Sequence, residues 1–322
     1  MRKIISIIIL TLCISSVCFS QQSPVYSQYV LNEFLINPAV AGIDGMTTIN
    51  LSGRKQWIGL QHAPETYSAS ISTRILKSPF SVSNRKIRRG TQGRVGLGAA
   101  FVSDKYGALS RTSFQLTYAY HFFIQNVQLS FGLNLVGTQL KIDTDLIDFR
   151  DPDTPLEGNL GKASFIPDAG VGFNFSTPNL HIGLTANDLL ESRINIGDVI
   201  LDSAQLRSPR NYIIHGFHRR LMRNRDWTFE PSIIIRGDER AQFSADITTR
   251  FIYKKEYWVG ASFRTSGELI ILAGLKWNRA YIGYSFDYGF NQLSYNSFGS
   301  HEILIAFKLG DSIRRYRWLE RY

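Results

Sequence analysis

The stretch Phe243-Ser244-Ala245-Asp246-Ile247-Thr248-Thr249-Arg250-Phe251 alternates between two kinds of side chain with a period of two. Successive side chains of a strand point to opposite faces, so one face of this strand is mainly apolar and carries Phe, Ala, Ile, Thr and Phe. The other face carries Ser, Asp, Thr and Arg. Residues 66–75 and 168–175 repeat the pattern. Strands with one apolar and one polar face separate two different environments.

Segments of this kind recur almost to the end of the chain. We expect strands at about 47–55, 66–76, 94–103, 112–122, 127–137, 167–176, 180–187, 211–219, 228–236, 242–252, 257–264, 269–276, 280–288 and 301–309. Most have the length of about 9–11 residues that a tilted strand needs to cross a bilayer, whereas soluble sandwiches use shorter strands. The sequence therefore predicts an all-β transmembrane outer-membrane β-barrel of about 14 antiparallel strands, with 12 as the alternative.

Residues 1–20 have the pattern of a cleaved signal peptide. Arg2 and Lys3 precede an apolar run, and small residues precede a cut that leaves Gln21 first. A membrane anchor is the less favoured alternative because the run is short. Export, together with the long amphipathic strands, predicts the outer membrane of a Gram-negative bacterium. Export also excludes nucleic acid as the partner of a chain with net charge +10. Both cysteines, Cys13 and Cys18, lie in this segment, which excludes thiol chemistry and Cys-based zinc sites beyond it.

The mature chain divides into an N-terminal segment at 21–45, periplasmic or lumenal, a barrel at 46–310 and a basic periplasmic tail at 311–322. With an even number of strands, the turns at the inner end are expected to be short and the outer loops long. The inner turns and the tail are rich in Lys and Arg, which suit contact with outer-membrane lipid or with an acidic partner. Aromatic residues near the inner turns predict an interfacial girdle: Tyr120, Phe122, Phe123, Trp227, Phe229, Tyr253, Tyr257, Trp277 and Tyr281.

The sequence offers no catalytic, cofactor or metal site that we would assign. Neither HExxH nor GxSxG occurs. Histidines 121, 181 and 215 fall on polar faces, where we expect hydrogen bonds inside the lumen. The acidic stretch Asp143–Asp153 lacks the glycine and spacing of an EF-hand, which disfavours a calcium site. Both signs of charge are mixed along the polar faces, and this favours a plugged or narrow lumen over a selective pore.

Several short motifs are spread along the mature chain. They begin with VYSQYVLN at 25–32 and INPAVAG at 36–42, and RKQWIG at 54–59 follows. Further on come DKYG at 104–107, LTYAYH at 116–121, IGYSFDY at 282–288 and GSHEI at 299–303. Together these motifs resemble the PorP/SprF family of outer-membrane proteins associated with the type IX secretion system. The basic tail is a departure, because members of the family usually stop near the final strand.

The resemblance implies a non-enzymatic barrel that serves secretion, gliding motility or surface retention of proteins such as adhesins. Its implied partners are a secreted adhesin or other type IX cargo, other secretion components and a periplasmic peptidoglycan-binding protein. The segment 21–45 either packs in the lumen as a plug or docks a partner. The candidate partner-binding residues are Tyr26, Ser27, Gln28, Tyr29, Asn37, Pro38, Arg314, Arg315, Arg317 and Trp318. The alternative function is a passive or ligand-specific outer-membrane channel.

Overall fold

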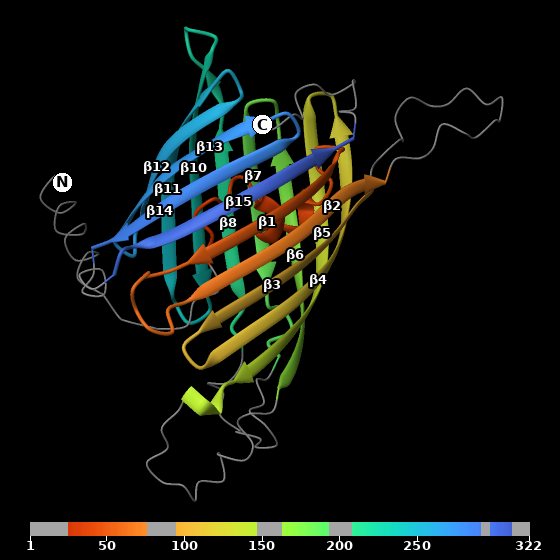
Figure 1. Cartoon of the computed structure of the whole chain (residues 1–322). Helices are drawn as coiled ribbons and strands as arrows, with labels where there is room; N and C mark the ends of the chain where they lie inside the picture. The colour runs from red at the N-terminus through yellow and green to blue at the C-terminus, as the bar shows by residue number, and fades with distance from the viewer. Residues whose placement is uncertain (1–24, 76–94, 147–162, 193–207, 291–296, 311–322) are drawn as a thin grey trace, which may run out of the picture.

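The computed structural model describes residues 25–75, 95–146, 163–192, 208–290 and 297–310 (Figure 1). Its strands are β1 (Thr47–Lys55), β2 (Glu65–Ile75), β3 (Val95–Tyr106), β4 (Leu109–Ile124), β5 (Val127–Ile142), β6 (Ser164–Ser176), β7 (Leu180–Asn187), β8 (Asn211–His218), β9 (Arg220–Leu221), β10 (Trp227–Asp238), β11 (Phe243–Tyr253), β12 (Tyr257–Arg264), β13 (Glu268–Trp277), β14 (Ala280–Gly289) and β15 (Ser300–Leu309). Single-turn 3-10 helices are η1 (Glu33–Leu35), η2 (Pro38–Val40) and η3 (Thr144–Leu146). Within these described ranges, no helix is long and apolar enough to cross a membrane.

The strands close into one antiparallel barrel. Neighbours in sequence pair with each other, and β1 closes the ring by pairing with β15, from Thr47 opposite Leu309 to Lys55 opposite His301. The short β9 continues β8 along the same side of β10, so the strand segments make a barrel of fourteen strands, as the sequence predicts. Closure gives each of the fourteen strands a hydrogen-bonded neighbour on both sides, as a barrel in lipid requires.

The strands β3, β4 and β5 run longer than their alternation indicates. The sequence predicts ends near residues 103 and 137, but β3 continues to Tyr106 and β5 to Ile142. It predicts a start near residue 112 for the strand between them, but β4 already begins at Leu109. A two-residue turn with Gly107 at φ +58° joins β3 directly to β4. The outward face of these extensions is polar, as at Ser110 and Thr112 on β4 and at Gln139 and Lys141 on β5. The hydrogen-bonded ladder continues there without the apolar outward face that marks a strand in the sequence.

The two faces of the wall differ as the alternation predicts. On β5, Leu133 and Leu135 are 59% and 68% exposed on the outside, while Asn134 between them is 5% exposed. The outer face therefore forms an apolar belt suited to lipid. Tyr281 is an exception to the predicted girdle: it is buried in the lumen, where the ammonium groups of Lys276 and Lys308 lie 5.3 and 5.5 Å from its ring centre. The side chain of Tyr281 points into the lumen because of its place in the alternation of β14, even though the residue lies near a turn.

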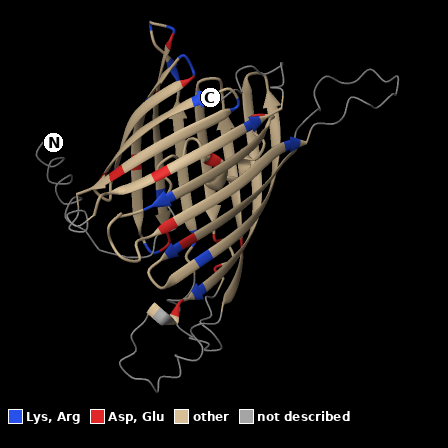
Figure 2. Ribbon diagram, in the orientation of Figure 1, with Lys and Arg blue, Asp and Glu red and all other residues tan. Residues whose placement is uncertain are grey.

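Charged residues occur along the strands of the wall (Figure 2), and several of them are buried there in ion pairs. Arg54 on β1 lies 2.7 Å from Asp287 on β14 and 3.2 Å from Glu302 on β15, and all three side chains are at most 4% exposed. Further around the wall, Glu230 contacts Arg219 and Arg250, and Asp246 contacts Arg236 and Arg264. A buried charge is tolerated only with such partners.

Arg54 and Lys55 point to opposite faces of β1, so we expect their substitution to lower the stability by very different amounts. Arg54→Leu leaves Asp287 and Glu302 buried without their guanidinium, so we expect it to lower the free energy of unfolding by about 3–5 kcal/mol. Lys55→Leu removes a half-exposed pair with Glu65 at 2.6 Å and should cost about 1 kcal/mol at most. Urea unfolding in lipid vesicles measures both variants. Equal losses would contradict the assignment of the two faces.

Candidate functional site

The N-terminal segment from Val25 to Gly45 lies inside the barrel, behind the front strands of Figure 1. We call these residues the plug. All of them except Val25, Leu35 and Asp44 are buried, although only η1 and η2 have regular structure. A segment of this kind needs partners for its backbone groups, and the polar inner face of the barrel supplies many of them.

The first anchor of the plug is the acidic group on β14 and β15. The backbone N–H of Ser27 donates to the Glu302 carboxylate at 2.8 Å, and the Ser27 hydroxyl donates to Asp287 at 2.6 Å. Arg54 donates to the same Ser27 hydroxyl at 2.7 Å, so the wall's ion pairs also hold the plug. The Gln28 side chain donates to the Glu302 carbonyl at 3.3 Å. Tyr26 is buried beside this group, and burial raises the pKa of its phenol.

The middle of the plug is held mainly by apolar contacts. Tyr29 and Ile36 pack in one cluster with Ile213, Phe217 and Ile234 of β8 and β10. Leu31 and Phe34 belong to two further clusters on other strands of the wall. The Tyr29 hydroxyl also lies 2.8 Å from the Ser232 hydroxyl. Each large apolar side chain buried here stabilises the docked plug by roughly 1.5–3 kcal/mol.

Asn37 and Pro38 form the start of η2. The Asn37 side-chain oxygen accepts from the backbone N–H of Ala39 at 2.9 Å, which caps the short helix, and Pro38 occupies its first turn. The Asn37 amide donates to the carbonyl of Phe173 on β6 at 3.0 Å. The motif INPA therefore serves the plug twice, as a local cap and as a contact with the wall.

Glycines of the wall make room for the plug backbone. A Cβ at Gly132 would lie 2.2 Å from the backbone nitrogen of Ala39, and one at Gly172 would lie 2.1 Å from the Asn37 side-chain oxygen. A Cβ at Gly96 would lie 2.0 Å from the carbonyl oxygen of Ala41. Two more glycines, Gly98 and Gly283, face plug side chains at similarly short distances. The plug thus docks where the wall has no side chains.

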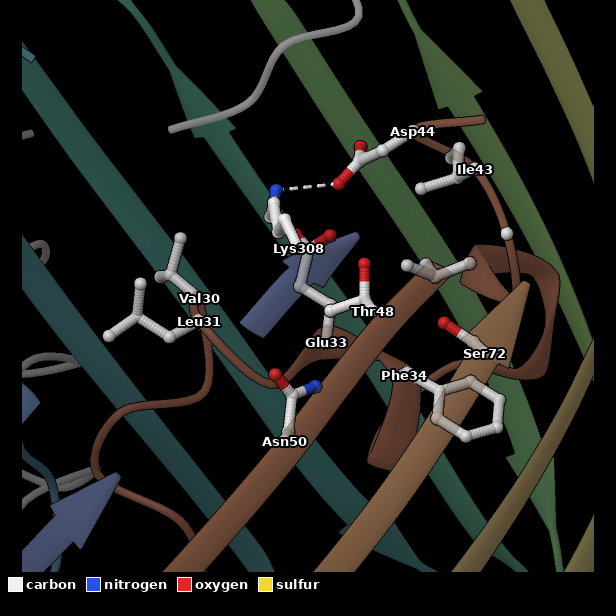
Figure 3. A pocket seen from close by; sticks show the side chains of 12 residues that line it. Val30, Leu31, Glu33, Phe34, Ile43, Asp44, Thr48, Asn50, Ser72 and Lys308 are labelled. Carbon is white, nitrogen blue, oxygen red and sulfur yellow. Dashed lines mark hydrogen bonds and ion pairs between the residues drawn. The ribbon is translucent and has the colours of Figure 1, made fainter. Parts of the chain in front are cut away.

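Side chains of the wall hold the last residues of the plug. Arg74 donates to the Ile43 carbonyl at 2.6 Å, and His121 lies 3.0 Å from the Ala41 carbonyl. Lys308 pairs with Asp44 at 2.7 Å across a small cleft between plug and wall (Figure 3). The cleft is lined by both the plug and the strands β1, β2 and β15.

The structure brings together six of the ten candidate residues from the sequence. Tyr26, Ser27, Gln28, Tyr29, Asn37 and Pro38 all lie in the plug and contact the wall. Their role in binding a partner protein stays a prediction. The other four, Arg314, Arg315, Arg317 and Trp318, lie outside the described residues, as does most of the acidic stretch Asp143–Asp153. The sequence placed Arg54 near the end of the strand expected at 47–55 and did not identify its pairing with Asp287 and Glu302.

The expected histidine contacts are present in the lumen. His121 lies 2.8 Å from the Ser130 hydroxyl, and His181 lies 2.9 Å from the Ser176 hydroxyl. His215 is 1% exposed and its ring lies beside that of His181. These contacts confirm the prediction of hydrogen bonds for His121 and His181.

Fourteen antiparallel strands, an apolar belt and a polar lumen filled by the N-terminal segment define a plugged outer-membrane β-barrel. The family model described as "Type IX secretion system membrane protein PorP/SprF" matches residues 18–307, and the chain belongs to this family. The protein is accordingly an outer-membrane protein of the type IX secretion family, and the cleaved signal peptide stays a prediction.

The chain also matches solved structures at low sequence identity. The toluene transporter TbuX of Ralstonia pickettii matches with a TM-score of 0.51 at 10% identity, over 86% of this chain and 92% of that chain. The P. putida toluene transporter TodX matches at 0.48 and 10% identity, over 85% and 92% of the two chains. Omp33 of Acinetobacter baumannii matches at 0.46 and 6% identity, over 83% and 100%. No curated protein matches the chain. At such identities, the TbuX match supports the barrel fold alone.

The glycine contacts predict that a single methyl group disturbs the plug. Gly132→Ala places a Cβ against the backbone of Ala39, so we expect a loss of about 1–3 kcal/mol in stability and faster proteolysis within residues 25–45. Gly237→Ala is the matched control, because its Cβ would meet only the Gln242 carbonyl at 3.7 Å. Limited proteolysis of the folded protein, read by mass spectrometry, compares the two. Equal protection of the plug in both variants would contradict the close docking.

Proposed function

We propose that this protein is a non-enzymatic accessory barrel that supports secretion or surface retention of proteins exported by the type IX system, with adhesins as a cargo class. Membership of the PorP/SprF family supports the link with secretion. The observation that carries the proposal is the plug, because residues 25–45 fill the lumen and are anchored to both its charged and its apolar wall. A filled barrel acts on other proteins through its exposed ends and its outer surface.

The exposed basic turns support contact with an acidic partner at the inner end. Six cationic side chains are exposed on β9 and in the turns before β10, β12 and β14: Arg220, Arg223, Arg225, Lys254, Lys255 and Arg279. Such a surface attracts acidic proteins and anionic lipid headgroups. A periplasmic peptidoglycan-binding protein is our proposed partner there, and the basic tail with Arg314, Arg315, Arg317 and Trp318 is its proposed extension.

The channel function is the alternative, and it requires the plug to leave. In planar bilayers we expect the wild-type protein to show no steady conductance, because the lumen is occupied. Deletion of residues 25–45 should produce open-channel currents, since the polar wall then encloses water. Steady wild-type currents as large as those of the deletion would contradict a closed lumen and favour the channel.

The secretion role is tested in the host. We expect that deleting the gene changes the surface and medium proteome measured by mass spectrometry, with loss of one large adhesin if the barrel serves a dedicated cargo. Loss of many secreted proteins would indicate a general role in the system. Restoring the wild-type gene is the control. An unchanged proteome would contradict a role in secretion or retention.

A further inference from the structure

Three side chains from separate parts of the chain meet deep in the lumen. Glu33 belongs to η1 of the plug, His181 to β7 and His215 to β8. Their exposed fractions are 5%, 2% and 1%. We propose that Glu33, His181 and His215 form a binding site for a divalent transition-metal ion of the zinc type, which ties the plug to the barrel wall.

The spacing of the ligand atoms suits one small ion. One ligand atom from each residue can be chosen so that all three lie within 4.8 Å of one another, and the His181 Nε2 lies 3.3 Å from the Glu33 Oε1. Two ligands of a tetrahedral zinc ion, each bound at about 2.0–2.2 Å, are about 3.4 Å apart. The Glu33–His181 pair already has this separation, and a ring nitrogen of His215 lies within 4.8 Å of a ligand atom of each.

The surroundings orient the imidazole of His181. Its Nδ1 lies 2.9 Å from the Ser176 hydroxyl, which in turn accepts from the Asn174 amide at 2.9 Å. The Phe217 ring stacks on the other side at 4.6 Å between ring centres. With Nδ1 held in this way, Nε2 faces Glu33. Metal-binding histidines commonly have such a hydrogen bond on the second ring nitrogen.

A glycine creates the space for the second histidine. A Cβ at Gly183 would lie 2.1 Å from Cε1 and 2.5 Å from Nε2 of His215, and 2.6 Å from the Asn37 amide nitrogen. The ring of His215 therefore reaches the plug only because residue 183 has no side chain. His181 and His215 then lie with ring centres 5.7 Å apart, on adjacent strands of the wall.

The ligand types select the class of ion. Two imidazoles and one carboxylate suit Zn²⁺ and neighbouring transition metals, whereas Ca²⁺ and Mg²⁺ prefer shells of oxygen atoms. Three protein ligands leave a fourth position for water. Because Glu33 is on the plug and both histidines are on the wall, the ion would add a bond that must break before the plug can leave. The site does not depend on the proposed secretion role.

Zinc binding by the refolded full-length barrel tests the proposal. The protein is refolded in detergent without metal, ZnCl₂ is titrated by calorimetry, and the bound metal is counted by mass spectrometry after gel filtration. We expect about one tightly bound Zn²⁺ per chain, and loss of that ion in Glu33→Gln, His181→Ala and His215→Ala. His218→Ala is the matched control, because His218 lies on the same strand with an exposed side chain and should retain the ion.

Two further measurements distinguish specific zinc binding at these three residues from nonspecific binding. Ser176→Ala, which removes the support of His181, should weaken zinc binding by about 10–100-fold. Zn²⁺ should also slow proteolysis of residues 25–45 in the wild type and leave Glu33→Gln unaffected, a near-isosteric variant whose folding is checked by heat-modifiable gel migration. Absence of zinc binding in the wild type, or equal binding by the ligand variants and His218→Ala, would overturn the proposal.

Discussion

Backbone hydrogen bonding inside a bilayer is the constraint on which the rest of this structure depends. Lipid offers no partners to N–H and C=O groups, so a spanning sheet must close on itself. The pairing of β1 with β15 performs this closure and places the two ends of the barrel sequence side by side. Closure separates two environments, and each strand must then present apolar side chains to lipid and polar side chains to the lumen.

The polar inner face creates a second requirement, which the plug meets. Charges such as Glu302 and Asp287 are buried within the wall and need partners. Arg54 supplies one partner, and the backbone and hydroxyl of Ser27 supply others. The plug therefore completes the polar network and, through Tyr29 and Phe34, also buries apolar surface in the lumen. One segment thus stabilises the barrel and closes it.

The sequence predicts the wall better than it predicts the site. Alternation along segments such as 243–251 identifies the strands and their inward faces, because side-chain direction in a strand follows position. The same alternation misses the ends of β3 and β5, where the outward face is polar. Alternation does not decide whether the segment 21–45 lies in the periplasm or in the lumen, since the plug has almost no periodic structure. Alternation also placed His181 and His215 inward, but it contains no information on the approach of Glu33.

Glycine explains part of that difference. In a strand pattern, glycines such as Gly132 and Gly172 indicate only a lower strand propensity. The folded barrel shows that the plug occupies the space that these glycines leave. Contacts of this kind depend on the curvature of the closed sheet. A local sequence pattern therefore does not predict these contacts.

Accessibility of the plug in isolated outer membranes is the most direct measurement. The native cysteines precede the expected signal cleavage site, so Ala39→Cys introduces a single thiol at a position that is fully buried. We predict that this thiol resists maleimide until the barrel is denatured, whereas Phe298→Cys, at a position 78% exposed, reacts at once. Equally fast labelling of both variants in intact membranes would contradict a lumen filled by residues 25–45.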